Sequence, residues 1–244
     1  MEEHLTKEER KQLRKQEWQE KITSEERKKR FSRIAWWVGG ALLLIFAVWF
    51  IVSVMNTPTA TTAALTAPGP KPTDMTYGNP KSKVVLTEYA DFQCPGCGAY
   101  YPIVKQLTQQ YKDKILFVYR FFPLTQIHQN ALVASEAGYA AALQGKFWPM
   151  HDLLFAHQND WATLADPSND FIAYAQEAGL NIDQFKKDYT SDKVANYIKS
   201  QEQAALDLGL PGTPSFFLNG KQIANPPTYA DFQKLIDDAL AQAK

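Results

Sequence analysis

Cysteine is scarce in this chain: its 244 residues include only two, Cys94 and Cys97. A disulfide-rich secreted scaffold needs several pairs that lie far apart in sequence, and a four-cysteine zinc site needs four. Histidine is scarce as well, and His128, His151 and His157 show no ligand spacing relative to one another. The sequence therefore predicts neither a disulfide framework nor a metal site.

The chain also lacks a net charge, because 26 Lys and Arg residues balance 26 Asp and Glu residues. The balance is uneven: residues 1–33 carry 11 basic and 8 acidic side chains, which leaves the rest of the chain mildly acidic. A mildly acidic body is poorly suited to neutralising many phosphates. We therefore expect no nucleic acid among the principal partners.

One long apolar run stands out, the 22 uncharged residues 34–55 (IAWWVGGALLLIFAVWFIVSVM). A helix of this length reaches roughly 33 Å, enough to cross a hydrocarbon core of about 30 Å. The apolar stretch of a cleavable signal peptide is shorter, about 7–15 residues, although the small residues after position 55 leave cleavage open. The run predicts a single transmembrane anchor that contacts membrane lipid.

The charges beside this run predict its orientation. Four Lys and Arg residues crowd positions 28–33, whereas the next basic residue is Lys71. The positive-inside rule then places the N-terminus in the cytosol and the chain after residue 56 outside, at the cell membrane. Residues 1–33 read as a solvated, charged helical segment, with partner binding or contact with anionic lipid as the alternative.

The remaining chain divides by composition and periodicity. Residues 56–74 begin uncharged and rich in Thr, Ala and Pro, which predicts an extended linker. Apolar periodicity then predicts strands, helices and a hairpin turning at Asn219-Gly220. The expected order is a strand at 84–90, a helix at 94–111, a strand at 115–122, helices throughout 128–208, a hairpin at 215–224 and a helix at 228–243. This order predicts an α/β domain, residues 75–127 and 209–244, interrupted by a helical subdomain at 128–208.

The motif Cys94-Pro95-Gly96-Cys97 lies where a predicted strand gives way to a helix. The unpaired N–H groups and positive dipole end of that helix favour a Cys94 thiolate, the form that attacks disulfides and also leaves well. Cys97, one turn further, is placed to resolve a mixed disulfide. A structural disulfide, half of a metal site and two inert cysteines are the alternatives. The first contributes only about 2 kcal/mol for so short a loop.

Three stretches carry a family resemblance. TEYADFQCPGCGAYYP resembles the active-site segment of DsbA-like disulfide oxidoreductases of the thioredoxin superfamily, and GLPGTPSFFLNG resembles their cis-proline loop. Between them, VYRFFPL and QGKFWPMHDLLFAHQ resemble the inserted helical subdomain. The likeness covers roughly residues 75–243. It implies a thioredoxin-like fold with a helical insertion and a thiol:disulfide oxidoreductase without a cofactor beyond the Cys94–Cys97 pair.

The resemblance also assigns roles to single residues. It implies a cis Thr213-Pro214 bond packed against the cysteines, with Pro95, Gly96, Thr213 and Pro214 at the client-binding surface. The Thr213 backbone then pairs with an extended client segment. Glu88 corresponds to a carboxylate beneath the second cysteine that exchanges its proton. Burial suits that role because it raises a carboxyl pKa. The alternative is a strand-end Glu that faces water.

Gly96, Asp91 and His151 also bear on the chemistry of the site. Gly96 stands where a histidine often occurs in the family, so we expect a less depressed Cys94 pKa and a less strongly oxidising disulfide. Asp91 has either a turn-forming or an electrostatic role. His151 reads as a hydrogen-bonded core histidine, with a catalytic role as the alternative.

Oxidation of client thiols, with reoxidation by a quinone-coupled membrane partner, is the favoured function. A reductase or isomerase with the same site is one alternative, and a non-catalytic metal-chaperone or assembly module is the other.

Overall fold

The computed structural model describes residues 65–243. The predicted cytosolic segment, 1–33, and the predicted membrane anchor, 34–55, lie outside the described residues and stay predictions. Among the helices of the described part, none is both long and apolar enough to cross a membrane.

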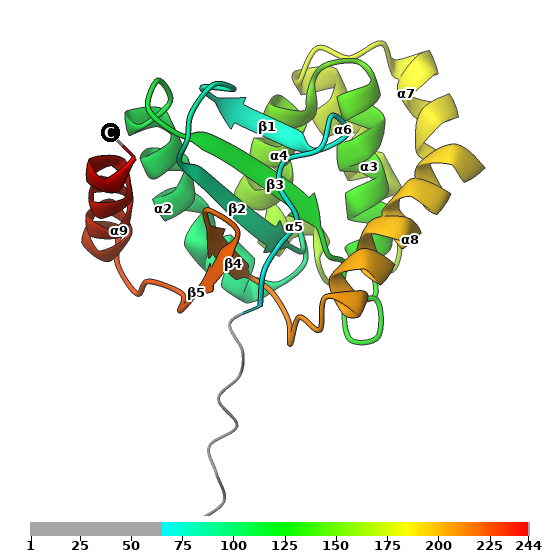
Figure 1. The fold of residues 1–244 in the computed structure, drawn as a ribbon. Helices are drawn as coiled ribbons and strands as arrows, with labels where there is room; N and C mark the ends of the chain where they lie inside the picture. Colours follow the sequence, from blue (N-terminus) through cyan, green and yellow to red (C-terminus); the bar gives the residue numbers. More distant parts are fainter. Residues whose placement is uncertain (1–64, 244) are drawn as a thin grey trace, which may run out of the picture. The chain divides into compact units, whose positions relative to one another are not determined.

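A mixed sheet of five strands forms the centre of the described domain (Figure 1). The strands lie in the order β1-β3-β2-β4-β5, and β2 and β3 are parallel while the other neighbouring pairs are antiparallel. The strands are β1 (Met75–Gly78), β2 (Val85–Ala90), β3 (Leu116–Phe121), β4 (Ser215–Leu218) and β5 (Lys221–Ile223). The sheet and its helices confirm the expected α/β architecture.

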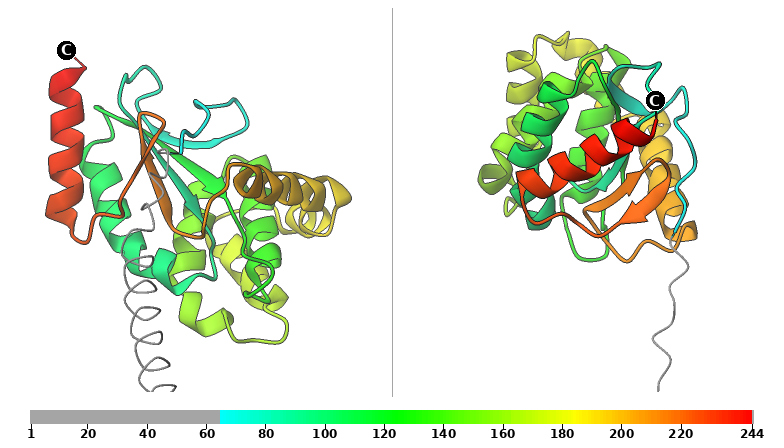
Figure 2. Two further views of the ribbon diagram at one scale, coloured as in Figure 1. Left: turned by 60° about the horizontal axis from the view of Figure 1, so that its bottom comes forward. Right: turned by 60° about the vertical axis from the view of Figure 1, so that its left-hand side comes forward.

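Helix α2 (Pro95–Gln110) connects the two parallel strands, as a parallel pair requires a long crossover. Strand β3 is buried at every position and β2 at all but its first, which explains why both read as nearly continuous apolar runs. Helix α9 (Tyr229–Gln242) packs beside α2 (Figure 2). The hairpin forms where expected, with Asn219 at φ 51° and Gly220 at φ 81°, and is confirmed.

A block of helices separates β3 from β4, as the periodicity of residues 128–208 predicts. Helices α3, α7 and α8 group together on one side of the sheet in Figure 1, and α3 packs against α4, α7 and α8. The block consists of α3 (Ala131–Leu143), α4 (Phe147–Ala156), α5 (Gln158–Trp161), α6 (Ser168–Glu177), α7 (Ile182–Tyr189) and α8 (Asp192–Asp207).

Residues 65–74, which the sequence places in the linker, pack against the domain. The Ala67 N–H donates to the Gly220 carbonyl oxygen at 2.8 Å, and Thr66 forms a β-bridge with Lys221. This segment pairs with backbone groups that β5, an edge strand, otherwise leaves open. Strand β1, which the sequence analysis leaves unassigned, similarly pairs with β3 at the opposite edge. Composition misses these pairings because both partners come from distant sequence.

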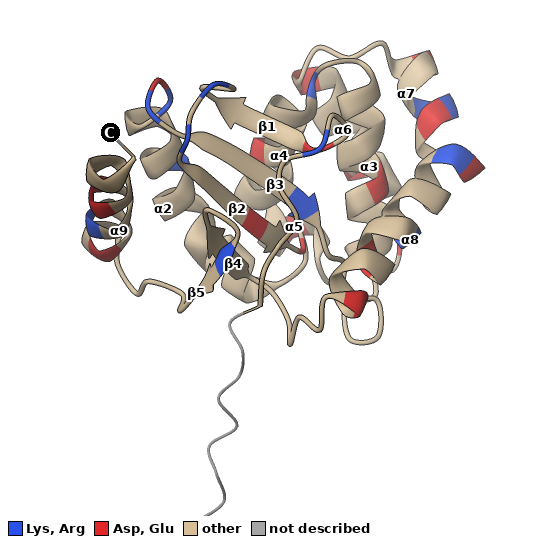
Figure 3. Cartoon of the chain, in the orientation of Figure 1, with Lys and Arg blue, Asp and Glu red and all other residues tan. Residues whose placement is uncertain are grey.

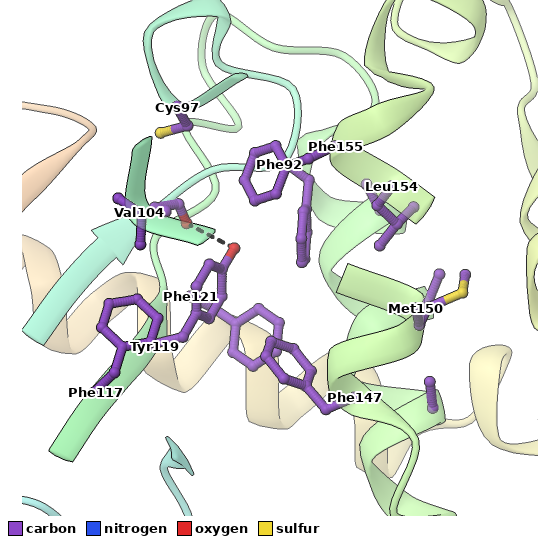
Figure 4. Packing of buried hydrophobic residues seen from close by; sticks show 14 of the residues in the cluster. Phe92, Cys97, Val104, Phe117, Tyr119, Phe121, Phe147, Met150, Leu154 and Phe155 are labelled. Atoms are coloured by element: carbon purple, nitrogen blue, oxygen red, sulfur yellow. Dashed lines mark hydrogen bonds between the residues drawn. The ribbon is translucent and has the colours of Figure 1, made fainter. Parts of the chain in front are cut away.

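The two faces of the sheet bury different side chains, since successive residues of a strand point to opposite faces. Leu86 and Ala90 of β2 belong to the larger core, which includes α2 and α4. Tyr89 belongs to a smaller core with Ala205 and Leu210. Figure 4 shows the larger core as a cluster of aromatic rings from β3 and α4, with the Cys97 side chain at its edge. This arrangement places the predicted redox motif over an apolar interior.

Candidate active site

Cys94 lies at the start of α2, as its position before Pro95 predicts. It is the N-cap residue, in an extended conformation at φ −67° and ψ 121°, and Pro95 occupies the first turn. The Gly98 N–H donates to the Cys94 carbonyl oxygen at 3.1 Å, which begins the helical ladder. The free N–H groups of the first turn therefore surround the Cys94 sulfur.

The two cysteines, both free thiols, have opposite electrostatic environments. A hydrogen bond from the Cys97 side chain lowers the pKa of Cys94 to about 5; burial opposes this, while Thr213 and the N–H groups of Cys97 and Gly96 add to it. Burial raises the pKa of Cys97 well above its usual value, and the charges of Glu88 and Cys94 add to the effect. Cys94 is thus a thiolate near neutral pH, whereas Cys97 holds its proton.

The Thr213–Pro214 peptide bond is cis, as the resemblance implies. Cys94 Sγ lies 3.4 Å from the Thr213 carbonyl oxygen, to which it donates when protonated, so the loop before β4 lies against the cysteine. The buried Thr213 hydroxyl makes no hydrogen bond of standard geometry within residues 65–243, yet it lies close enough to the Cys94 sulfur to lower its pKa. A Cβ at Gly96 would lie 3.3 Å from Pro214 Cδ and 3.5 Å from Cys94 Sγ. Gly96 therefore permits the close approach of the two loops.

Glu88 is buried within the sheet instead of facing water. It is 4% exposed, and the strand that carries it, β2, lies between β3 and β4 (Figure 3). Desolvation raises the pKa of Glu88 to about 8. Its charge contributes to the raised pKa of Cys97, so the two groups are close enough to interact. A carboxyl group with such a pKa is able to take or give a proton near neutral pH, and its predicted role toward Cys97 stays a prediction.

Asp91 has the turn-forming role that the sequence leaves open, and its electrostatic role stays a prediction. Its Oδ1 accepts the Gln93 N–H at 2.7 Å, which forms the turn before the motif, and its Oδ2 lies 2.6 Å from His128 Nδ1. Oδ2 also accepts the Leu124 N–H, while the Asp91 N–H points at Cys97 Sγ at 3.5 Å. The completely buried Asp91 thus ties the cysteine loop to the segment that opens the helical block. Sequence reasoning missed His128 because 37 residues separate the partners.

Gln158 of α5 is a second residue that sequence reasoning missed. Its Nε2 donates to the carbonyl oxygens of Phe92 at 2.6 Å and Cys94 at 2.9 Å. A Cβ at Gly98 would lie only 2.3 Å from Gln158 Oε1, so the glycine after Cys97 makes room for this clamp. The glycine at position 98 was the only sequence signal of this contact, but a glycine does not identify the residue that packs against it. The helical block therefore holds the active-site turn as well as covering the sheet.

The chemistry that this arrangement supports rests on the two sulfur atoms. Within 65–243, no three His, Cys, Asp or Glu residues gather closely enough to hold a metal ion. A stabilised thiolate at the N-terminus of α2, a protonated thiol one turn further and a carboxyl group nearby suffice for thiol–disulfide exchange. The roles assigned to Pro95, Gly96, Thr213 and Pro214 in client binding stay predictions.

Solved structures with a similar fold include disulfide oxidoreductases. α-DsbA1 of Wolbachia pipientis is 22% identical with a TM-score of 0.64 over 71% of this chain and 94% of that one. BdbD of Bacillus subtilis is 18% identical with a TM-score of 0.64 over 73% and 98%. A thioredoxin-like oxidoreductase of Silicibacter pomeroyi is 26% identical with a TM-score of 0.58 over 71% and 95%.

Curated relatives of known sequence are longer proteins. The Na⁺/H⁺ antiporter NhaA 3 of Salinispora tropica is 36% identical over 70% of this chain, and NhaA 1 of Salinispora arenicola is 38% identical over 61%. The chain spans about a quarter of the length of these relatives. The family model described as thioredoxin matches residues 70–238, which include the cysteine motif, the helical block and the cis-proline loop. The chain therefore belongs to the thioredoxin family and carries a thioredoxin-like domain whose structural neighbours are DsbA-like oxidoreductases.

Proposed function

We propose that this chain is a membrane-anchored thiol:disulfide oxidoreductase that oxidises client protein thiols outside the cytosol. The observation that carries the proposal is the opposite shift of the two thiol pKa values, downward at Cys94 and upward at Cys97. Because the thiolate is the reactive form of a cysteine, this difference makes Cys94 the cysteine that forms the mixed disulfide with a client. Cys97 is then the cysteine that resolves the mixed disulfide. The predicted span at 34–55 supplies the anchor.

The reaction proceeds through a mixed disulfide. A client thiolate attacks the Cys94 sulfur of the oxidised pair, the S–S bond to Cys97 breaks, and the departing Cys97 thiolate takes a proton from Glu88. A second client thiolate then attacks the client sulfur, and Cys94 leaves as a thiolate. The client loses two electrons and gains a disulfide. The protein ends with a Cys94 thiolate and a Cys97 thiol, which a quinone-coupled membrane partner reoxidises.

The stabilised Cys94 thiolate favours oxidation of clients over their reduction. A thiol with a low pKa is a good leaving group, and stabilising the reduced protein makes its disulfide the stronger oxidant. The resemblance to DsbA-like proteins points the same way. Clients bind as an extended segment against the Thr213 backbone, beside an open groove of about 440 Å³ lined by the cis-proline loop and β5.

The reduction potential of the full-length chain in detergent tests the direction. After equilibration with glutathione buffers, we expect a value between about −200 mV and about −120 mV, more oxidising than thioredoxin at about −270 mV but, because Gly96 replaces a histidine, below the strongest oxidants. The wild type should also oxidise a reduced, unfolded client, while Cys94→Ser should not. A potential below about −250 mV would contradict the oxidase and favour a reductase.

Trapping experiments test the roles of the two cysteines. A Cys97→Ala variant should accumulate mixed disulfides with clients through Cys94, because no resolving thiol remains. Cys94→Ala should accumulate few, since the Cys97 thiol is buried and protonated. Equal trapping by both variants would show that the roles are not divided in this way.

The predicted location needs a separate test. Protease added to intact cells or spheroplasts should digest the thioredoxin-like domain and spare residues 1–33. Protection of the domain would contradict the extracytoplasmic site.

The antiporter relatives favour a second candidate function. Segments similar to this chain form part of proteins named Na⁺/H⁺ antiporters, so a thioredoxin-like module can share a polypeptide with a membrane transporter. In this alternative the domain binds a membrane protein and assists its assembly without turnover. A Cys94→Ser, Cys97→Ser double variant distinguishes the two functions. If the protein is an oxidase, the variant should lose all function. If it is an assembly module, the variant should still bind its partner, which crosslinking recovers.

A further inference from the structure

A partly enclosed cavity of about 80 Å³ lies between α2, α4 and the sheet, and Glu88 lines it. We call it the Glu88 cavity. A water molecule needs at least about 10–15 Å³ of such space, so the cavity has room for several. Its polar and aromatic lining includes Glu88, Tyr101, Lys105, Trp148, His151 and Asp152.

The lining runs from a buried end to an exposed one. Glu88 is 4% exposed, whereas the side chains of Lys105 and Asp152 are 41% and 37% exposed. His151, with a side chain 8% exposed, bonds to Asp152 through Nδ1 and Oδ1 at 3.1 Å. One cavity is thus lined both by the buried carboxyl group and by side chains that are partly exposed to solvent, and His151 and Asp152 are bonded to each other in its wall.

Other routes from Glu88 to solvent are poor. Burial alone accounts for the raised pKa of Glu88, and no hydrogen bond in the described part of the chain joins its carboxyl group to a side chain that leads to solvent. On the active-site side stands Cys97, which is 1% exposed. On β3, Tyr119 pairs in register with Glu88, but burial raises the pKa of this phenol well above its usual value. The cavity, by contrast, has room for water between Glu88 and its other lining side chains.

The outer groups form a connected chain of ionisable side chains. Asp152 Oδ2 accepts from Lys105 Nζ at 2.8 Å, and Lys105 Nζ also donates to the Tyr101 hydroxyl at 3.0 Å. Burial opposes ionisation of Asp152, but hydrogen bonds from His151 and Lys105 lower its pKa. Burial lowers the pKa of His151, although the bond to Asp152 partly offsets this. A neutral imidazole beside a carboxylate is able both to accept and to donate a proton.

We propose that the Glu88 cavity is the path by which Glu88 exchanges its proton with solvent, with His151 as the relay and Asp152 at the outer end. The proposal rests on the proposed function and extends it beyond the cysteines. When Cys97 leaves as a thiolate it takes the Glu88 proton; cavity water then reprotonates Glu88, and His151 replaces that proton from solvent beside Asp152. In the reverse direction the same proton moves outward. No electron transfer occurs along the path.

Every charged or titratable group around Glu88 enters the pH dependence of this exchange. On the active-site side it is Cys97, and on the neighbouring strands Tyr77 and Tyr119. The groups on the helices are Tyr101 and Lys105 of α2 and His151 and Asp152 of α4. His151 also packs edge-on against Phe92, Tyr119 and Phe155, so a purely structural role must be separated from a relay.

The test uses the full-length chain in detergent and follows opening of the Cys94–Cys97 disulfide by excess dithiothreitol, at several buffer concentrations and from about pH 5 to about pH 9. Positioned acids and bases raise reaction rates by about 10²–10⁴-fold. Slower delivery of protons to such an acid should therefore lower the rate by about threefold to tenfold. We expect His151→Gln and Asp152→Asn to slow the reaction by this factor in dilute buffer. Their rates should recover as buffer concentration rises, because external buffer replaces the relay.

The chain offers a matched control. His157 pairs with Asp160 at 2.8 Å in a similar His–Asp contact, but it does not line the Glu88 cavity. His157→Gln should keep the wild-type rate at every buffer concentration. If His151→Gln and Asp152→Asn behave like this control while Glu88→Gln is slow, the relay is wrong and the proposed function stands. If Glu88→Gln also keeps the wild-type rate, the acid role of Glu88 is wrong as well.

A rescue experiment separates relay from packing. His151→Ala removes the imidazole and enlarges the cavity, so added imidazole should restore the rate toward wild type. Pyrazole has a similar shape but does not accept protons near neutral pH, and it should not restore the rate. Equal rescue by both compounds, or thermal destabilisation of His151→Ala with no rescue by imidazole, would show that His151 only fills space.

Discussion

Two buried ionisable residues lie on the adjacent central strands β2 and β3, and their hydrogen bonding differs completely. Arg120 of β3 is 3% exposed and Glu88 of β2 is 4% exposed. The Arg120 guanidinium donates to both Asp74 oxygens, to the Tyr89 hydroxyl and to the carbonyl oxygens of Pro68 and Gly69. No hydrogen bond within the described chain contributes to the pKa of the Glu88 carboxyl, which burial alone raises.

The contrast shows that Arg120 has a structural role, whereas Glu88 is suited to a role in proton transfer. A buried charge with every donor paired fixes the parts that it joins, here β3 and residues 68–74. A buried carboxyl without partners stays protonated at neutral pH, so it is available to give that proton away. The two faces of one sheet thus serve two purposes: one attaches the segment that leads into the domain, and the other supports the cysteines.

Removing the partner of Arg120 should have the largest effect on stability. Asp74→Ala leaves a buried guanidinium without its counter-charge, which typically costs about 3–5 kcal/mol of the free energy of unfolding. Urea unfolding at neutral pH measures this cost, and Asp113→Ala, at an exposed site, is the control. The exchange rate of the molecules that remain folded should stay unchanged. A loss below about 1 kcal/mol would mean that the pair contributes no more than a surface ion pair.

Removing the Glu88 carboxyl should change the free energy of unfolding in the opposite direction. Because burial raises the folded pKa to about 8, the folded state binds more protons than the unfolded state between about pH 4.5 and 8. Stability of the wild type therefore falls as pH rises through this window, by up to about 3 kcal/mol at pH 7. Glu88→Gln should abolish that fall, be more stable than wild type at pH 7, and still exchange disulfides more slowly. A variant that is less stable at pH 7 would contradict the raised pKa.

The smallest expected effect concerns Gly96, which joins the cysteine face to the cis-proline loop. Gly96→His adds a cationic group beside the Cys94 thiolate, and one further unit of lowered pKa corresponds to about 1.4 kcal/mol, or about 30 mV. We expect the reduction potential to rise by a few tens of millivolts. Thiolate absorbance against pH measures the pKa, and glutathione equilibration measures the potential.

The new Cβ contacts Pro214 closely, so a steric control is needed for this prediction. Gly96→Ala adds the Cβ without the charge and should leave the potential near the wild-type value. A similar rise in both variants would show that the contact with Pro214, and not thiolate stabilisation, changes the potential.

The order of elements followed from the sequence because its signals are local. Alternation and apolar runs predicted β2 and β3, Pro95 predicted the start of α2, and Asn219-Gly220 predicted the hairpin between β4 and β5. The segment 65–74 was predicted to be part of a linker because its composition resembles a tether. In the structure it packs on the domain through hydrogen bonds with Gly220 and Arg120. Local composition carries no information about such distant partners.

By itself, the sequence determined the place of the redox motif, since a cysteine followed by proline between a strand and a helix acquires its environment from its immediate neighbours. Only the tertiary structure decided that Glu88 is buried, that Asp91 meets His128, and that Gln158 holds the Cys94 carbonyl. The cavity beside Glu88 belongs to this second group. Helix propensity and turn geometry are properties of a few adjacent residues, whereas burial and hydrogen bonding of a side chain depend on elements that the chain brings back from 30 to 70 residues away.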